Sequence, residues 1–249
     1  MSDEVLDTLR LATTEEVWSP LFEAGYVRQF DGGWRQTHPG NVLVGQAITA
    51  QFVPHRPDHD AAVVAAGARK GHTEGDKQNS WVIELLEHGD VMVVDIFGKV
   101  VEGTVIGDHL GTAVASRTGV GAVIDGGIRD LAGLEQLGGG VNILHRGVDP
   151  TPIRNVTLAG INLPIRVGSV TVLPGDVVLG TPTGVSVIPA HLAVEVAAAS
   201  EATRVFDVFG KQRLAERQYT SAQIDVPTWD ADMKADYQQW LATRGQRTA

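Results

Sequence analysis

The order of apolar and polar positions along the chain predicts an α/β protein. Runs rich in β-branched and apolar residues predict strands over 42–53, 91–97 and 121–127. Apolar residues at helical spacing predict helices over 109–118 and 190–217. Strand and helix patterns therefore follow one another, which is typical of a sheet covered by helices.

Glycine and proline predict where several of these elements end. A helix is expected to begin at the paired threonines 13–14 and to end before Gly25, with a break near Pro20. The segment PHRPDHD, residues 54–60, is expected to be a loop. An interruption of the long helix is expected near Gly210, because glycine is a poor helix former.

The chain is expected to form one domain over residues 1–215, followed by a C-terminal helical extension over 216–249. Residues 141–189 are rich in strand patterns separated by Pro-Gly-Asp and Thr-Pro-Thr-Gly turns. The tail carries one more helical pattern, DADMKADYQQWLATR. No internal repeat or low-complexity linker separates further units.

Composition narrows the classes of function. The 249 residues include no cysteine, which excludes disulfides and thiolate chemistry. The formal net charge of −10, with scattered lysines and arginines, argues against a nucleic acid partner. No apolar run is long enough for a membrane helix, and the first residues do not have the pattern of a secretory signal. We therefore expect a cytoplasmic location and no membrane partner.

The stretch GDHLGTAVASRTGVGAVIDGGIRD, residues 107–130, concentrates the candidate chemistry. Asp108 begins a predicted helix, whose free N–H groups and dipole attract anions. Arg129 and Asp130 follow a buried strand, and ligands of α/β proteins collect at the carboxyl ends of strands. Carboxylates that hold a hard cation, beside an arginine that grips an oxyanion, suit a 2-oxo acid. A simpler interpretation makes Asp108 a helix cap and Arg129–Asp130 a surface ion pair.

The spacing of these residues resembles a known signature. Twenty residues separate Asp108 from Arg129-Asp130. This spacing matches the D-x20-R-D motif of the class II pyruvate aldolases in the 4-hydroxy-4-methyl-2-oxoglutarate aldolase family. That family shares its fold with the regulator of ribonuclease activity A. The segments VGQAITAQ and GDVVLGTPTGVSVIP also resemble the family, and the resemblance covers roughly residues 15–215. It implies a layered β/β/α fold.

The resemblance also implies roles for individual residues. Asp130 would ligate a divalent metal, Mg²⁺ or Mn²⁺, and Arg129 would contact the keto oxygen and stabilise the pyruvate enolate. Asp108 would hold a water on the metal and assist proton transfer. Glu201 is one candidate for an acid supplied by a neighbouring subunit of a trimer or hexamer. Backbone amides would bind the substrate carboxylate, namely those of Gly107, Asp108, His109, Leu110 and Gly111.

The implied function is a metal-dependent lyase that cleaves a 4-hydroxy-2-oxo acid to pyruvate, with oxaloacetate decarboxylation as a side activity. Thr181 stands where many members of the family carry an aspartate, and both the 54–90 segment and the C-terminal arm depart from the family pattern. Two alternatives therefore stay open. One is a lyase or dehydratase for a sugar-derived acid, and the other is a non-catalytic protein that binds and regulates a ribonuclease.

Other candidate residues carry weaker signals. His55, Asp58 and His59 form a possible metal group but lie in a predicted solvated loop, as do His72, Glu74 and Asp76. His109 follows Asp108 and is a candidate acid or base. Asp125 is expected to be structural. The segment GTPTG is expected to be a turn, because no phosphate-loop lysine follows it.

Overall fold

The computed structural model describes residues 1–73, 77–226 and 228–245. Within these residues a nine-stranded sheet forms the body, in the order β1–β11–β10–β3–β4–β5–β6–β2 with β7 beside β3. The strands are β1 Phe30–Gly32, β2 Arg35–Gln36, β3 Leu43–Pro54, β4 Asp90–Asp95, β5 Gly121–Ile128, β6 Asn142–Val148, β7 Val156–Ile161, β10 Val177–Gly180 and β11 Gly184–Ile188. A separate hairpin pairs β8 Ile165–Val167 with β9 Val170–Val172.

The centre of the sheet is parallel and largely buried. Strands β3, β4, β5 and β6 run parallel, and every residue of β5 is buried. Valine and isoleucine fill these strands because both of their faces are covered. The parallel arrangement brings the carboxyl ends of β4 and β5 to one edge, where the connections to the following helices begin.

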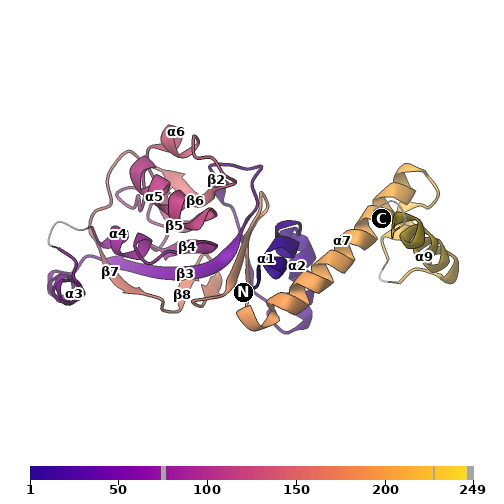
Figure 1. The fold of residues 1–249 in the computed structure, drawn as a ribbon, viewed down its shortest axis with the longest axis horizontal. Helices are drawn as coiled ribbons and strands as arrows, with labels where there is room; N and C mark the ends of the chain where they lie inside the picture. Colours follow the sequence, from indigo (N-terminus) through magenta and orange to yellow (C-terminus); the bar gives the residue numbers. More distant parts are fainter. Residues whose placement is uncertain (74–76, 227, 246–249) are drawn as a thin grey trace.

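Layers of side chains cover both faces of the sheet. Helices α4 Gln78–Ile83 and α5 Asp108–Thr118 pack on one face through a core that includes Ile83 and Val114. The hairpin β8–β9 packs on the opposite face around Val167 and Val172. Helices α1 Asp3–Arg10 and α2 Thr14–Glu23 and the first part of α7 cover β10 and β11 (Figure 1). The α/β layers predicted from the sequence are confirmed.

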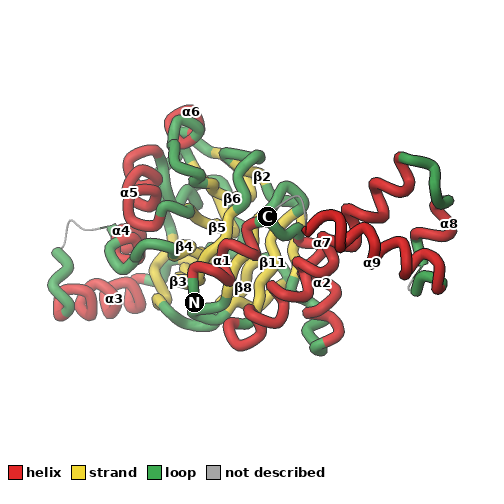
Figure 2. The backbone as a smooth tube through the Cα atoms, turned by 45° about the vertical axis from the view of Figure 1, so that its right-hand side comes forward, coloured by secondary structure: helices red, strands yellow, loops and turns green. Residues whose placement is uncertain are grey.

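The C-terminal arm leaves this body along α7 Ala193–Ala215, which a short 3₁₀ turn, Ala190–Leu192, precedes. The far half of α7 carries α8 Ser221–Ile224 and α9 Ala231–Gly245 away from the sheet, as both views show (Figures 1 and 2). A second small core, built on Phe209, Trp229 and Met233, holds the arm together. Residues on both sides of position 215 contribute to this core, while the boundary at 215 stays a prediction.

Three predicted boundaries are wrong for local reasons. Helix α2 continues through Pro20, because Val17 and Leu21 anchor it to the core on either side of the lost hydrogen bond. Helix α3 Pro57–Arg69 begins inside the expected loop, since Pro57 occupies its first position, where no amide is needed. Helix α7 continues through Gly210, where a larger side chain would press on Ile224.

Predicted helix ends elsewhere follow the sequence. Thr13 and Glu16 form a reciprocal capping box at the start of α2. Gly119 ends α5 in the left-handed conformation, with φ of 67°. None of the helices among the described residues combines the length and apolar character needed to cross a membrane.

Candidate functional site

The residues at the two ends of the 107–130 stretch come together at the carboxyl end of β5. The backbone N–H of Arg129 donates to the carbonyl of Ile106 at 3.0 Å, which joins the end of β5 to the segment that leads into α5. The short helix α6 Leu131–Leu134 follows at once and packs on α5 (Figure 1). The predicted juxtaposition of Asp108, Arg129 and Asp130 is thus present in a single chain.

Gly107 lies directly against the charged pair. A side chain at this position would collide with a carboxylate oxygen of Asp130 and would lie 3.0 Å from Arg129 Nε. Gly107 is buried and is the N-cap residue of α5. The positive end of the α5 dipole therefore points toward the Asp130 carboxylate.

Arg129 and Asp130 form an exposed ion pair. Arg129 Nε lies 3.4 Å from Asp130 Oδ2, and the side chains are 42% and 43% exposed. The simpler interpretation as a surface pair therefore fits the isolated chain, and such a pair contributes little stability. The same openness leaves the guanidinium and the carboxylate free to turn toward a ligand.

Asp130 itself has an unusual backbone. Its φ of 52° and ψ of 42° place it in the left-handed region, which aspartate and asparagine tolerate better than most residues. This conformation turns the chain from β5 into α6, and the Asp130 carbonyl accepts bonds from the amides of Gly133 and Leu134. A rare backbone conformation at a residue with candidate chemistry is typical of functional sites.

Asp108 is the first residue of α5 and not its cap. Its Oδ1 accepts the backbone N–H of His109 at 2.8 Å, and Gly107 takes the cap position. The interpretation of Asp108 as only a helix cap is therefore wrong, because the chain turns into the helix one residue earlier. Its side chain is partly exposed and packs against Gly133 of α6.

The amides at the start of α5 are partly occupied. The His109 amide bonds to Asp108, and the Gly111 amide donates to the Gly107 carbonyl at 2.8 Å as α5 begins. Leu110 turns toward the core beneath, and the His109 side chain is exposed. Fewer amides are thus available to a substrate carboxylate than the predicted run Gly107–Gly111 implies, because a forming helix uses its own donors.

Glu201 does not reach this site within its own chain. It lies on α7, which covers the opposite end of the sheet from α5 and α6 (Figure 1). Its side chain is 57% exposed and lies 3.6 Å from Arg204. The candidate site of a single chain therefore does not include Glu201.

The carboxylates fit a hard cation that keeps most of its waters. Among the described residues, no group of three or more His, Cys, Asp or Glu side chains is clustered for metal binding. Asp108 and Asp130 therefore offer two oxygen-donor side chains, and magnesium is commonly held by one or two carboxylates with several waters. The residues present match that mode of binding and do not match a closed structural metal site.

The other candidate groups lie elsewhere. Asp58 pairs with Arg56 on exposed α3, and the hydrogen bonds from Arg56 lower the pKa of Asp58. His55 contacts Thr157 Oγ1 at 3.3 Å, where it links β3 to β7. His72 stacks on Trp81 with ring centroids 4.4 Å apart. The remaining members of the predicted polar loop, at positions 74 and 76, lie outside the described residues.

Asp125 has a structural role in a partly buried charge network that the sequence did not reveal. Arg146 Nε donates to Asp125 Oδ1 at 2.7 Å, and another nitrogen of Arg146 lies 2.5 Å from Asp31 Oδ2. The guanidinium also lies 3.6 Å from the ring centre of Trp34. This network fixes β5, which delivers Arg129, and the partners come from distant positions that no local pattern connects.

Asn79 is a second residue that sequence reasoning missed. It is buried, and its Nδ2 donates to the Val105 carbonyl at 2.6 Å, two residues before Gly107. Within the described part of the chain, its Oδ1 has no hydrogen-bond partner. Asn79 thus anchors the segment that leads to Asp108. A buried amide in a polar stretch gives no spacing signal that could have identified it.

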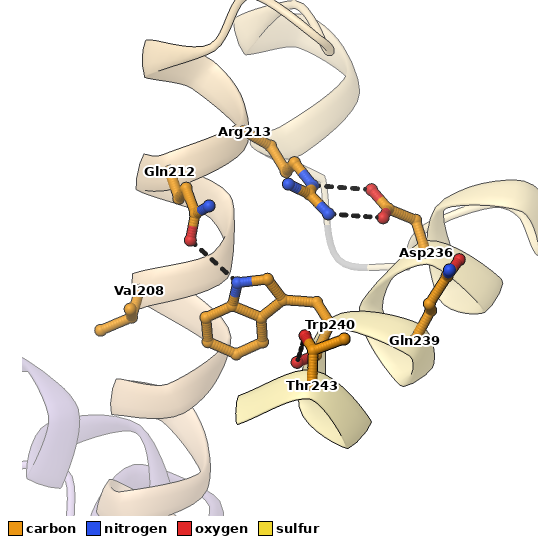
Figure 3. A pocket seen from close by; sticks show the side chains of 7 residues that line it. All are labelled: Val208, Gln212, Arg213, Asp236, Gln239, Trp240 and Thr243. Atoms are coloured by element: carbon orange, nitrogen blue, oxygen red, sulfur yellow. Dashed lines mark hydrogen bonds and ion pairs between the residues drawn. The ribbon is translucent and has the colours of Figure 1, made fainter. Parts of the chain in front are cut away.

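A cavity of about 530 Å³ opens in the arm, away from the predicted residues (Figure 3). Arg213 on α7 holds Asp236 on α9 with two bonds of 2.6 and 2.8 Å, and these bonds lower the pKa of Asp236. Trp240 Nε1 donates to Gln212 at 2.8 Å. These contacts hold α9 against α7, so they have a structural role in the arm.

Sequence comparisons identify relatives of the body. The family model described as RraA-like, Aldolase/RraA, matches residues 3–187. A protein from Halalkalibacterium halodurans named "Putative 4-hydroxy-4-methyl-2-oxoglutarate aldolase" is 35% identical over 102 residues, which are 41% of this chain and 47% of that protein. One of the same name from Shewanella oneidensis is 32% identical over 114 residues, 45% of this chain and 68% of that protein. The chain thus spans about half the length of the first relative.

Structural comparisons agree with this result. RraAS2 of Streptomyces coelicolor, described as an unusual member of the RNase ES inhibitor RraA protein family, superposes with a TM-score of 0.70 at 26% identity. The superposition covers 86% of this chain and 98% of RraAS2. A protein from Pseudomonas syringae pv. tomato has a TM-score of 0.72 at 24% identity and covers 90% and 93% of the two chains, which supports the fold alone.

Proposed function

The chain belongs to the RraA-like family, and on that premise we propose that it is a divalent-metal-dependent lyase that cleaves a 4-hydroxy-2-oxo acid to pyruvate. The observation that carries the proposal is the meeting of Asp108, Arg129 and Asp130 at the carboxyl end of β5, around buried Gly107. The names of the relatives from Halalkalibacterium and Shewanella point to the same reaction class.

The proposed mechanism assigns each residue one task. Asp130 would ligate the cation and Asp108 would hold a water on it, and the cation would supply a Lewis acid at the 2-oxo group. Arg129 donates to the keto oxygen as negative charge builds there. Asp108 orients a water that accepts the proton of the 4-hydroxyl group. As the C3–C4 bond breaks, the C4 oxygen becomes the carbonyl oxygen of the second product and the electron pair of the bond forms the pyruvate enolate. Protonation of the enolate at C3 gives pyruvate.

Oxaloacetate decarboxylation is the expected side activity. Loss of carbon dioxide from oxaloacetate leaves its electron pair on the same carbon and produces the same enolate. Arg129 can therefore stabilise both reactions without a change of position.

The first experiment measures pyruvate release from oxaloacetate and from 4-hydroxy-4-methyl-2-oxoglutarate, with Mg²⁺ and with EDTA. Asp130→Asn is the informative variant, because asparagine tolerates the left-handed backbone at this position while the charge is lost. Glu135→Gln makes the same change of charge on an exposed residue five positions away and serves as the control. Turnover that persists in EDTA or in Asp130→Asn would refute the proposed site.

We propose in addition that a homo-oligomer, a trimer or hexamer, completes the site with Glu201. The exposed position of Glu201 on α7, away from its own chain's Asp108, supports this arrangement. Mixing inactive Asp130→Asn and Glu201→Gln subunits should restore activity to about one quarter of the sites, if neighbouring subunits combine at random. No recovery after subunit exchange would exclude the shared site.

A ribonuclease-binding role is the second candidate, and the similarity to RraAS2 favours it. A binding surface has no need of the cation ligand. Capture of a ribonuclease of the RNase ES type that is as strong with Asp130→Asn as with the unchanged chain, together with no pyruvate release, would select this function over the lyase.

A lyase or dehydratase for a sugar-derived acid is the third candidate. The exposed helix α3 and the 54–90 segment around it support it, because they add surface that the small aldolases are not expected to need. A panel of sugar acids assayed beside the two 2-oxo acids separates this candidate from the aldolase.

A further inference from the structure

We propose that Gly133 is a positioning residue for Asp108, and that α6 sets the distance between Asp108 and Asp130 through this contact. The inference rests on the proposed function, because it gives the spacing of the two carboxylates a role in holding a cation. It concerns a residue outside the D-x20-R-D spacing, on a helix of four residues.

The contact between α6 and α5 leaves no room for a side chain at position 133. A Cβ placed on Gly133 would lie 2.7 Å from the Cβ of Asp108 and 3.3 Å from its Oδ2. The Cβ of Asp108 is fixed to the backbone of the first turn of α5, so it cannot rotate away. An added methyl group must therefore move the start of α5 away from α6.

The same short helix is tied to the other carboxylate. The amides of Gly133 and Leu134 both donate to the Asp130 carbonyl, at 2.9 and 3.1 Å. Leu134 in turn packs on Gly111, the next turn of α5. Because Gly133 has no side chain, it packs directly against Asp108, and its amide bonds to the Asp130 carbonyl. Any shift at Gly133 therefore changes the distance between the two acids.

A second glycine makes the arrangement reciprocal. Gly107, beside Asp108, leaves room for the carboxylate of Asp130, while Gly133, near Asp130, leaves room for Asp108. Each acid is thus packed on a glycine of the other segment. Close approach of two chain segments is a physical reason for glycine at both positions.

The backbone of Gly133 does not itself require glycine. Its φ is not in the left-handed region, and it lies in the first α-helical turn of α6. Alanine is the better helix former, so Gly133→Ala should not weaken the fold through its backbone. Loss of function in a variant that stays folded would therefore come from the contact with Asp108.

The test compares Gly133→Ala with Gly138→Ala. Gly138 lies shortly after α6, has no atom within 4 Å of a placed Cβ and has no left-handed backbone, so it is a matched control. Mn²⁺ affinity is measured by electron paramagnetic resonance titration, and pyruvate release from oxaloacetate is measured on the same samples. Loss of a partner that orients a metal ligand commonly weakens binding by 10-fold or more, and we expect roughly 10-fold for both readouts in Gly133→Ala. Gly138→Ala should match the unchanged chain, and Gly133→Ala should stay folded, with a thermal midpoint lowered by no more than about 10 °C by the overpacked contact.

A double variant shows whether Gly133 acts through Asp108. In the Asp108→Ala background the carboxylate is already absent, so Gly133→Ala should change neither readout by more than about twofold. Equal losses from Gly133→Ala in both backgrounds, or unchanged binding and turnover in Gly133→Ala alone, would overturn the inference and leave the proposed lyase standing. An unchanged chain that neither binds Mn²⁺ nor releases pyruvate would overturn the proposed function and the inference with it.

Discussion

Replacement of Arg146 by methionine would leave Asp31 and Asp125 facing each other without their shared cation. Arg146 donates to both carboxylates and to the Gly32 carbonyl, and its guanidinium lies over Trp34. Asp125 is only 5% exposed, so water cannot replace the lost partner. Methionine fills much of the space of the arginine stem, and the substitution therefore removes charge more than volume.

The expected cost follows from this burial. Breaking a buried pair by removal of one partner costs about 3–5 kcal/mol, and we take the lower end, about 3 kcal/mol, because Arg146 and Asp31 are partly accessible. For a chain of this length, each kcal/mol lowers the thermal midpoint by about 2–4 °C, which gives a decrease of roughly 6–12 °C at pH 7.

The pH dependence separates a charge effect from a packing effect. Burial alone would raise the pKa of Asp31, but the hydrogen bonds and charge of Arg146 and the bonds from Ser169 outweigh it and lower the pKa. The stabilisation is therefore complete above the unfolded pKa of about 3.9 and is lost as pH falls through the folded value. The variant lacks this stabilisation at every pH, so the difference in thermal midpoint between the two proteins should become smaller in acid.

The assay is thermal unfolding by circular dichroism at pH 7 and near pH 3.5, with Arg166→Met as the control on an exposed arginine. For Arg146→Met we expect a thermal midpoint far below that of the unchanged chain at pH 7 and a smaller difference in acid. Arg166→Met should not change the midpoint at either pH. A difference in thermal midpoint that is the same at both pH values would show that lost packing dominates. A difference near zero at pH 7 would refute the assignment of Arg146 as the cation that Asp31 and Asp125 need.

Three further predictions follow from other contacts. Trp229 is 4% exposed and stacks on Phe206 with ring centroids 3.7 Å apart, so it anchors the arm. Trp229→Ala should lower the free energy of unfolding by about 3–5 kcal/mol and raise amide hydrogen exchange in α8 and α9 alone. Trp18→Ala, at an exposed tryptophan, should have neither effect. Loss of the capping box by Thr13→Ala should cost about 0.5–2 kcal/mol in urea unfolding, without a change of Mn²⁺ binding. Mn²⁺ at about 100 times its Kd should stabilise the chain by about 2.7 kcal/mol in thermal unfolding, and Asp130→Asn should abolish this gain.

The sequence predicted most elements of the body because their signals are local. The buried run over 91–97 and the glycine after Thr118 depend on neighbours along the chain, and β4 and the end of α5 lie where those signals place them. Predictions failed where tertiary packing outweighed a local preference. Pro20 stays within α2 and Gly210 within α7, since contacts with the core or with Ile224 hold each helix through the unfavourable residue.

The candidate site likewise combines features that the sequence predicted with features that depend on the fold. Spacing and residue type indicated Asp108, Arg129 and Asp130, and the alternation of strand and helix explained why they should meet. Neither the left-handed backbone of Asp130 nor the use of the Gly111 amide by its own helix can be read from spacing. Asn79 and Arg146 were missed because their partners are distant in sequence.

By itself the sequence determined the α/β class, the chemistry available at residues 107–130 and the resemblance to the RraA-like family, because periodicity and motif spacing are properties of the chain alone. Only the tertiary structure decided that Gly133 packs on Asp108, that Arg146 joins Asp31 to Asp125, and that α7, which carries Glu201, covers the opposite end of the sheet from α5 and α6. Each of these relations depends on distances between segments that the fold brings together or keeps apart, and such distances are fixed by packing of the whole chain.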